Sequence, residues 1–421
     1  MASVCIKSLK KVFETERCEK KPLKTACLAV KSGGTFKVTW VSMTLMRHLI
    51  ERVLELTEAE TSSPAPTAPP LGEGSEVELQ ALLESLQPRI RVYGVGGAGC
   101  NAIGRLSEEG LFENSYVTGY AINTDAQALL MSPIEEKVLI GRTARGRGAG
   151  GDPTKGEAAA LESELALRRI TNDTQLAIIT AGMGGGSGTG AAGQIARLAK
   201  QQGAMTIAVV TYPFQSEGAL RKQNAEWGLE RLREHCDTIL VIPNERLLEI
   251  EGVKDLPISS AFRVGDELLV RSITGVAELL TIDGMVNLDF EDLRSVINFG
   301  SGVAMIGLGA ASGPGRAEAA TMEALHSPLL DIDTSDARGA LINVVGGANL
   351  TLGEAERCAK IIKDQISPHA QIIWGAAVKE ELDEEIRVML VLTGVKSEQI
   401  HGASENRQLR ALRNQQIEFV N

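Results

Sequence analysis

The sequence predicts an α/β protein with two α/β domains and a long helix between them. From residue 90 onward, Val- and Ile-rich runs alternate with helical patterns, and we expect each run to be a strand buried on both faces. The amphipathic stretch 259–282 has apolar residues at helical spacing. A second, smaller set of strands and helices follows it. The expected strands are 90–95, 117–122, 137–140, 176–181, 205–211 and 238–242, then 302–307, 341–345, 371–378 and 386–395; helices are expected near 315–326 and 351–366.

Composition agrees with a large α/β protein. The 421 residues suffice for two domains and tails, and 43% hydrophobic with only 4% aromatic residues suits cores of Ala, Val, Ile and Leu. A net charge of −11 argues against nucleic acid as the main partner. The six cysteines lack CxxC or metal-ligand spacing and are interpreted as free thiols of a reducing cytoplasm. No apolar run has the length of a membrane span.

The N-terminal region is divided into two segments. Residues 1–45 are rich in basic residues, although the whole chain is acidic, and they show little periodicity. A transit peptide and an over-extended gene model that starts before Met43 or Met46 both remain open, and we assign this extension no function. Residues 46–87 are expected to contain an amphipathic helix at 47–56, a Ser/Thr/Ala/Pro linker at 61–70 and a short helix at 76–86.

A glycine-rich loop between a buried strand and a helix is the most informative segment. Residues 182–190 read GMGGGSGTG. Glycines let backbone N–H groups turn toward a ligand, and a helix N-terminus adds partial positive charge. Ser187 and Thr189 add hydroxyl donors. Because a turn needed only for packing would use one or two glycines, this loop predicts phosphate binding.

A second glycine loop lies upstream, again between a strand and a helix. Residues 94–99 read GVGGAG, which fits the GxGxxG pattern of dinucleotide-binding enzymes. Alone, it would suggest an NAD-dependent oxidoreductase, but such enzymes need no second, longer loop. The chain lacks the GxxxxGK[ST] motif of P-loop NTPases. Two loops together favour a nucleoside triphosphate held by backbone amides.

Several motifs together resemble the tubulin/FtsZ family. Residues 184–190 (GGGSGTG) are similar to the tubulin signature loop, with Ser187 in place of the usual Thr. Similarity to the prokaryotic cell-division branch lies in NTDAQ at 123–127, RGRGAGGDP at 145–153 and NLDF at 287–290. The resemblance covers about residues 88–396, and a helix before the first strand suggests an archaeal member. The departures are Ser187, Ala98 for a usual Gly and Asp152 where Asn is common; Ser keeps the hydroxyl and Ala stays small.

The resemblance implies a domain organisation and a site for GTP or GDP. It implies a tubulin-like, Rossmann-type GTPase domain (88–258), a central helix (259–284) and a C-terminal α/β domain (285–396). Asp266 aligns with the residue that accepts the guanine N1–H and N2–H₂ groups, although a lone helical Asp is more often a solvated residue. Phe262 stacks on the base or is a core aromatic. Glu217 and Arg221 reach ribose and phosphates, or form only an exposed ion pair. The implied nucleotide-binding residues are Gly97, Ala98, Gly99, Cys100, Asn101, Asn123, Asp125, Gly184, Gly185, Gly186, Ser187, Gly188, Thr189, Gly190, Glu217, Arg221, Asn244, Phe262 and Asp266.

For hydrolysis, the resemblance points to residues outside the two glycine loops. Asp289 and Asp292, with Asn287, would be helix-capping residues if considered alone. They are similar to the family loop that completes the active site of the next subunit in a filament. We expect Mg²⁺ to be bound through the nucleotide and no protein metal site.

The resemblance implies a self-assembling GTPase of the mid-cell division ring, in the cytoplasm. A tubulin-like filament protein for cell shape or DNA segregation remains the alternative. Residues 397–421 are expected to be a flexible tether that ends in a basic and apolar peptide at 409–420, which membrane-anchoring and other division proteins would bind. Simple disorder is the other interpretation of this tail.

Overall fold

The computed structural model describes residues 25–32, 35–42, 88–249, 253, 256–281, 290–299, 303–327, 330 and 337–395. The chain divides into two units, residues 1–85 and 86–421. In the first unit, β1 (Thr25–Ser32) and β2 (Thr35–Ser42) form an antiparallel hairpin that the sequence analysis did not predict. The helices expected at 47–56 and 76–86, the linker at 61–70 and the tail at 397–421 lie outside the described residues.

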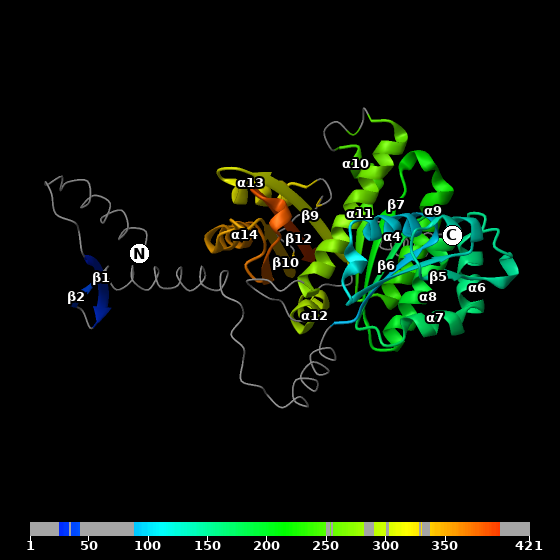
Figure 1. Cartoon of the computed structure of the whole chain (residues 1–421), viewed down its shortest axis with the longest axis horizontal. Helices are drawn as coiled ribbons and strands as arrows, with labels where there is room; N and C mark the ends of the chain where they lie inside the picture. Colours follow the sequence, from blue (N-terminus) through cyan, green and yellow to red (C-terminus); the bar gives the residue numbers. More distant parts are fainter. Residues whose placement is uncertain are drawn as a thin grey trace, which may run out of the picture. The chain divides into compact units, whose positions relative to one another are not determined.

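One ten-stranded sheet is the framework of the second unit (Figure 1). The strands are β3 (Ile90–Val95), β4 (Val117–Asn123), β5 (Lys137–Leu139), β6 (Leu176–Gly182), β7 (Met205–Tyr212), β8 (Thr238–Pro243), β9 (Val303–Ser312), β10 (Gly339–Gly346), β11 (Gln371–Val378) and β12 (Glu385–Thr393). Their order is β11-β10-β12-β9-β8-β7-β6-β3-β4-β5. Pairing is parallel throughout, except that β12 runs antiparallel to both of its neighbours.

The two predicted α/β domains therefore share a sheet. They join where β8 pairs with β9 through only two residue pairs, Ile239 with Val303 and Leu240 with Ala304. The observed strands agree with the predicted ones to within two residues, except that β9 continues five residues further, to Ser312. Such a junction was not predicted, because hydrophobic periodicity does not show which distant strands pair.

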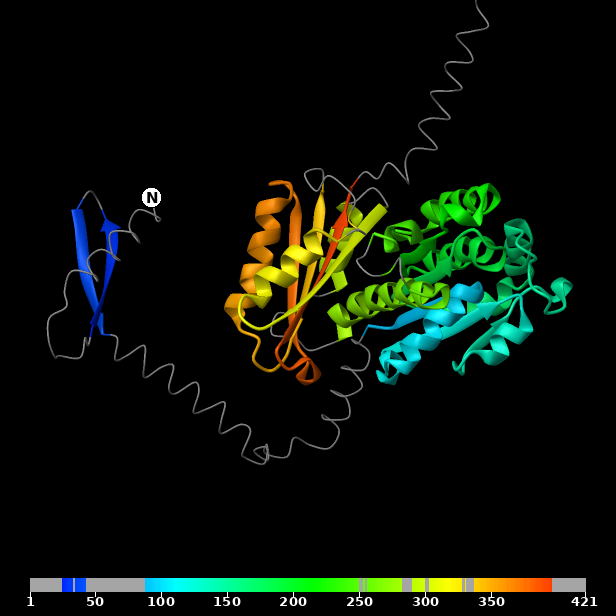
Figure 2. The same ribbon diagram turned by 90° about the horizontal axis from the view of Figure 1, so that it is seen from above.

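Helices cover both faces of the sheet. The GTPase-like half carries α4 (Gly96–Glu108) and α5 (Ala126–Met131) on one face and α6 (Pro153–Glu162), α7 (Glu164–Thr171), α8 (Ser187–Gln201) and α9 (Ala219–His235) on the other. The short α10 (Asn244–Leu247) follows β8. In the other half, α12 (Phe290–Phe299) packs opposite α13 (Arg316–Leu325) and α14 (Leu352–Gln365). Helix α11 (Ile258–Thr281) runs between the two halves (Figure 2).

Three hydrophobic clusters form the core, and alternation along each strand decides which cluster a side chain joins. Ile90 and Val92 of β3 pack with α4 and α11, whereas Tyr93 and Val95 pack with the helices of the opposite face. The third cluster lies between α13, α14 and the C-terminal strands. Each cluster contains one free, buried thiol: Cys100, Cys236 and Cys358, respectively.

The prediction that every strand of the first domain is buried on both faces is wrong for β5. This three-residue strand lies at the edge of the sheet, and two of its three side chains are exposed. One of them is the apolar Leu139, which keeps half of its surface accessible. A short edge strand offers little backbone for pairing with another chain, so its apolar side chains need no cover.

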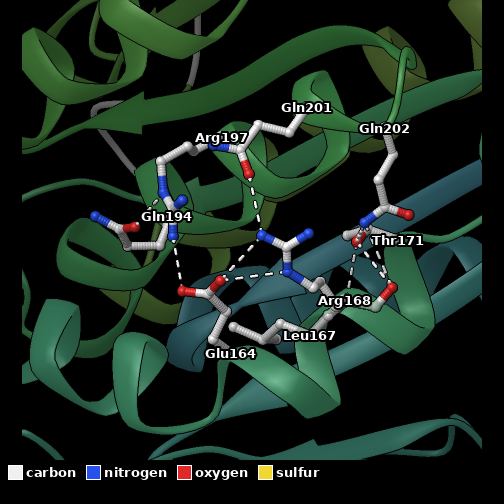
Figure 3. Close-up of polar contacts among 8 residues, drawn as sticks. All are labelled: Glu164, Leu167, Arg168, Thr171, Gln194, Arg197, Gln201 and Gln202. Atoms are coloured by element: carbon white, nitrogen blue, oxygen red, sulfur yellow. Dashed lines mark hydrogen bonds and ion pairs between the residues drawn. The ribbon is translucent and has the colours of Figure 1, made fainter.

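A polar network holds α8 against α7 (Figure 3). The carboxylate of Glu164 accepts bonds from Arg168 and from Arg197, each at 3.1 Å. Arg197 also donates to Gln194 at 2.8 Å, and Gln202 donates to Thr171 at 2.7 Å. Bonds that involve charged partners are stronger than neutral ones. The network therefore stabilises the position of α8, whose N-terminus lies at the site described next.

Candidate functional site

A cavity of about 290 Å³ lies at the carboxyl ends of β3, β6, β7 and β8. Ligands of open parallel sheets bind at this edge. We call this the first cavity. It is lined by Val95, Gly97, Ala98, Gly182, Met183, Gly185, Gly186, Ser187, Gly188, Thr211, Pro213, Glu217, Arg221, Asn244, Leu247, Gly265 and Asp266.

Two helices begin at the first cavity. Helix α4 starts at Gly96, directly after β3, and α8 starts at Ser187, after the glycine loop that follows β6. Neither helix has a side-chain cap at its N-terminus. The first N–H groups of a helix have no partner within it, and the helix dipole adds partial positive charge there. Together the two N-termini form a site suited to a polyanion.

The two glycine loops pack so closely that larger residues would not fit. A Cβ on Gly96 would lie 2.6 Å from the backbone nitrogen of Gly188, and a Cβ on Gly99 would lie 2.4 Å from the carbonyl oxygen of Thr180. Gly96 and Gly184 also have positive φ angles, of 75° and 99°. Glycine adopts this conformation at little cost, whereas side chains rarely do. These glycines bring both helix N-termini to one cavity.

Not every residue of the glycine loop at 182–190 faces the cavity. The hydroxyl of Thr189 accepts a bond from the Gly184 N–H at 2.9 Å and is buried. Gly190 packs against α6, where its Cβ would meet the carbonyl oxygen of Pro153. Ser187 does line the cavity, and its hydroxyl lies 2.5 Å from that of Thr124. Thr189 and Gly190 thus shape the loop, whereas Ser187 is available to a ligand.

The mouth of the cavity carries an ion pair. Glu217 and Arg221 pair with each other, and Glu217 also accepts a bond from the Phe214 N–H at 2.9 Å. Asn244, the first residue of α10, lines the cavity while nearly buried. The structure therefore brings Glu217, Arg221 and Asn244 together with the two loops, as the sequence analysis expected.

At the far side, Asp266 of α11 lines the first cavity. Its carboxylate Oδ2 lies 3.1 Å from Nη2 of Arg105, on α4. Burial raises the pKa of Asp266, and the charge of Arg105 opposes that rise. The sequence analysis missed Arg105. The available signal was its spacing of four residues from Asn101, which places both on one face of α4.

Some expected contact residues lie elsewhere. Cys100 and Asn101 line a second cavity, of about 600 Å³, with Arg105, Arg263 and Glu267. Asn123 and Asp125 line neither cavity. Asp125 instead caps α5, accepting bonds from the N–H groups of residues 127 and 128 at 2.9 and 3.2 Å. Gly99, Gly184, Thr189 and Gly190 also do not line the first cavity.

The residues expected to carry hydrolysis are only partly visible. Asn287 and Asp289 lie outside the described residues, as does the side chain of Phe262, whose backbone is in α11. Asp292 lies in the first turn of α12 and lines neither cavity. The two glycine loops carry no carboxylate, and the acidic residues among those described at the first cavity are Glu217 and Asp266.

The described part of the chain shows neither a metal centre nor a membrane-spanning helix. It contains no group of three or more His, Cys, Asp or Glu residues placed to hold a metal ion. None of its helices combines the length and the apolar character needed to cross a membrane.

Comparisons with known proteins agree with this geometry. Residues 89–252 match the model of the GTPase domain of the Tubulin/FtsZ family, and residues 302–396 match that of the FtsZ family C-terminal domain. Cell division protein FtsZ 1 of Archaeoglobus fulgidus is 48% identical over 331 residues, which cover 78% of this chain and 88% of that protein. FtsZ 1 of Thermococcus kodakarensis is 47% identical over 84% of this chain and 92% of its own.

Solved structures show the same fold. An empty FtsZ dimer of M. jannaschii is 46% identical, with a TM-score of 0.71, over 77% of this chain and 93% of that one. CetZ2 of Haloferax volcanii, solved as a GTPγS-bound protofilament, is 23% identical, with a TM-score of 0.65, over 78% and 99% of the two chains. At that identity the likeness to CetZ2 concerns the fold alone.

Proposed function

Because the chain belongs to the tubulin/FtsZ family, we propose that it is a GTPase of cell division that assembles head-to-tail into the filaments of the division ring. Convergence of two uncapped helix N-termini on one cavity is the observation that carries the proposal. The described residues that line this cavity include no lysine, so backbone amides would replace the lysine of a P-loop. An oxidoreductase would use only one of the two loops.

GTP would lie with its phosphates on the N-termini of α4 and α8. Glu217 and Arg221, at the mouth, would contact the ribose and phosphates, and Asn244 would contact the base or ribose, since an amide both donates and accepts. Asp266 would accept the N1–H and N2–H₂ groups of guanine. Mg²⁺ would be held through the phosphate oxygens and water, and it would neutralise phosphate charge.

Hydrolysis would require a second subunit. Asp289 and Asp292, with Asn287, would reach the γ-phosphate of the neighbouring subunit, where a carboxylate orients the attacking water. The bond between the β–γ bridging oxygen and the γ-phosphorus breaks, and GDP and phosphate leave. A contact between two different surfaces of identical subunits generates filaments. The position of Asp292 outside the first cavity of its own chain supports this division of roles.

The test is sedimentation of the purified protein with GTP, GDP or NAD, combined with GTPase rates over a range of protein concentrations. We expect pelleted filaments with GTP only, and a specific activity that rises through a threshold concentration. Activity strictly proportional to protein, at dilutions without polymer, would contradict a shared active site. Binding of NAD in preference to GTP would favour the oxidoreductase.

We place the protein in the cytoplasm, at the mid-cell ring, with membrane-anchoring and other division proteins bound at residues 409–420. The cell-division relatives support this placement. Deletion of residues 409–421 should leave filaments and GTPase activity intact but disperse the ring in cells. Filaments without any ring at mid-cell in the full chain would instead favour the alternative, a filament for cell shape or DNA segregation.

A further inference from the structure

We propose that Arg105 is the positioning residue for guanine selectivity, because its guanidinium holds the Asp266 carboxylate at the wall of the first cavity. This inference rests on the proposed function, since it presumes that the base of GTP meets Asp266. Arg105 itself lines the second cavity, not the first, so it would act through Asp266.

The geometry gives Arg105 two attachments to α11. Its Nη2 lies 3.1 Å from Asp266 Oδ2, and its Nη1 donates to the backbone carbonyl of Arg263 at 3.2 Å. The side chains of Arg105 and Asp266 are 27% and 24% exposed, so water screens their pairing only partly. A guanidinium with two fixed partners has little freedom to turn.

The ion pair does not prevent Asp266 from accepting a base. Arg105 contacts Oδ2, and an ionised carboxylate offers about four lone-pair sites on two oxygens. Asp266 can therefore accept the N1–H and N2–H₂ groups of guanine while it remains paired with Arg105. Fixing the plane of the carboxylate favours the two-bond contact that guanine makes and adenine, with an acceptor at N1, does not.

Arg105 also keeps the carboxylate in the ionised form that accepts two bonds. Burial raises the pKa of Asp266, and Arg105 lowers it. Other charged groups nearby are Arg263 and Glu267 on α11 itself, and Glu217 and Arg221 across the first cavity. Without Arg105, Asp266 would gain a proton at higher pH and then present a hydroxyl donor to the donor groups of guanine.

The experiment compares GDP, inosine diphosphate and ADP as ligands of the wild type, Arg105→Ala, Arg105→Gln and Arg105→Lys. Inosine diphosphate lacks only the exocyclic amine of GDP and keeps the N1–H, so the ratio of the two affinities measures the bond from N2–H₂ to Asp266. We expect Arg105→Ala to weaken GDP binding about tenfold or more and to reduce the preference for GDP over inosine diphosphate. Arg105→Gln should behave similarly, and Arg105→Lys should recover part of the loss.

Arg271→Ala is the matched control. Arg271 lies on α11, as Asp266 does, and pairs with Glu267 at 2.9 Å, but it does not line the first cavity. It should bind all three nucleotides as the wild type does. The pH dependence gives a second readout. As the pH is lowered, GDP affinity should begin to fall at a higher pH in Arg105→Ala than in the wild type, because the loss of Arg105 raises the pKa of Asp266.

Several outcomes would overturn the inference. A folded Arg105→Ala or Arg105→Gln protein with an unchanged ratio of GDP to inosine diphosphate affinity would remove Arg105 from selectivity. Equal losses for GDP, inosine diphosphate and ADP would indicate only a structural contact between α4 and α11. A wild type without preference for GDP over ADP would contradict the proposed function itself, and that result is distinct from the other two.

Discussion

At position 190, a neighbouring helix leaves no room for a residue larger than glycine. A Cβ there would lie 2.1 Å from the carbonyl oxygen of Pro153 and 2.5 Å from the backbone nitrogen of Glu157, both on α6. Gly185 in the same loop has nothing within 4 Å of its Cβ position and lines the first cavity. Glycine-rich sequence thus serves two purposes within a few residues, and the sequence alone does not separate them.

Gly190→Ala should therefore destabilise the nucleotide-free protein, because α8 must move away from α6. We expect the free energy of unfolding in urea to fall by roughly 1–3 kcal/mol. Gly185→Ala is the control and should change that free energy little. Equal stability of both variants would show that the contact between α6 and α8 adapts without cost.

Much of the site could be predicted at the level of residues. Glu217, Arg221, Asn244, Asp266 and part of each glycine loop were expected, and the structure brings them to one cavity. Arg105 was missed, because its spacing from Asn101 does not show that it pairs with Asp266, which depends on the contact between α4 and α11. Asn101 was expected at the base, and it lines the second cavity next to Arg105.

Among the elements, the hairpin β1–β2 is the clearest omission, although its signal was present. An apolar run, TACLAVKS, and a run in which apolar and polar residues largely alternate, TFKVTWVS, flank a Gly-Gly pair. Such a pair between two such runs favours a two-residue hairpin turn. By contrast, α11 was predicted within a few residues, because a long amphipathic period leaves little ambiguity.

Helix α14 depends on a charge pair at its N-terminus. Arg316, only 6% exposed, donates to both carboxylate oxygens of Glu354, at 2.8 and 3.1 Å. Thr351 adds a capping box, since its N–H donates to the Glu354 carboxylate at 3.0 Å and its hydroxyl oxygen accepts the Glu354 N–H at 3.3 Å. These partners lower the pKa of Glu354 from 4.5 to about 2.

The low pKa of Glu354 predicts an acid-dependent loss of stability. The pair stabilises the folded state fully above pH 4.5, and this contribution is lost as the pH falls from 4.5 toward 2. Glu354→Gln should lower the free energy of unfolding at pH 7 by about 1 kcal/mol or more and flatten the curve of stability against pH in that interval. Parallel curves for variant and wild type would contradict this. Glu356→Gln, on the same helix, is the control.

For the whole molecule, the division of labour between subunits gives a prediction. Asp289→Ala should keep nucleotide affinity but lose GTPase activity, because Asp289 would act on the neighbour's nucleotide. Ser187→Arg should lose nucleotide binding altogether. Ser187 lines the first cavity and its hydroxyl contacts Thr124, so an arginine side chain would have to occupy the space of the nucleotide. Equilibrium binding of GDP to dilute protein and phosphate release at high protein concentration measure the two effects. Loss of nucleotide from monomeric Asp289→Ala would mean that Asp289 belongs to its own chain's pocket.

The continuous sheet could not be predicted from sequence, and it raises the question of whether the two halves open together. Only two residue pairs join β8 to β9, but one hydrophobic cluster includes α4, α11 and residues of β9, β10 and β12. We expect this shared cluster, more than the short ladder, to couple the halves.

The coupling between the two halves can be measured through the buried thiols of Cys100, Cys236 and Cys358. Burial raises the pKa of Cys100 to about 11 and raises those of Cys236 and Cys358 as well, so each thiol reacts with an alkylating reagent only when its surroundings open. Peptide mass spectrometry would follow the three alkylation rates separately. Equal rates for Cys100, Cys236 and Cys358 would report one cooperative opening, as the shared cluster predicts. Faster alkylation of Cys358 alone would show that the C-terminal half opens independently. The three alkylation rates would then give a separate opening rate for each part of the core.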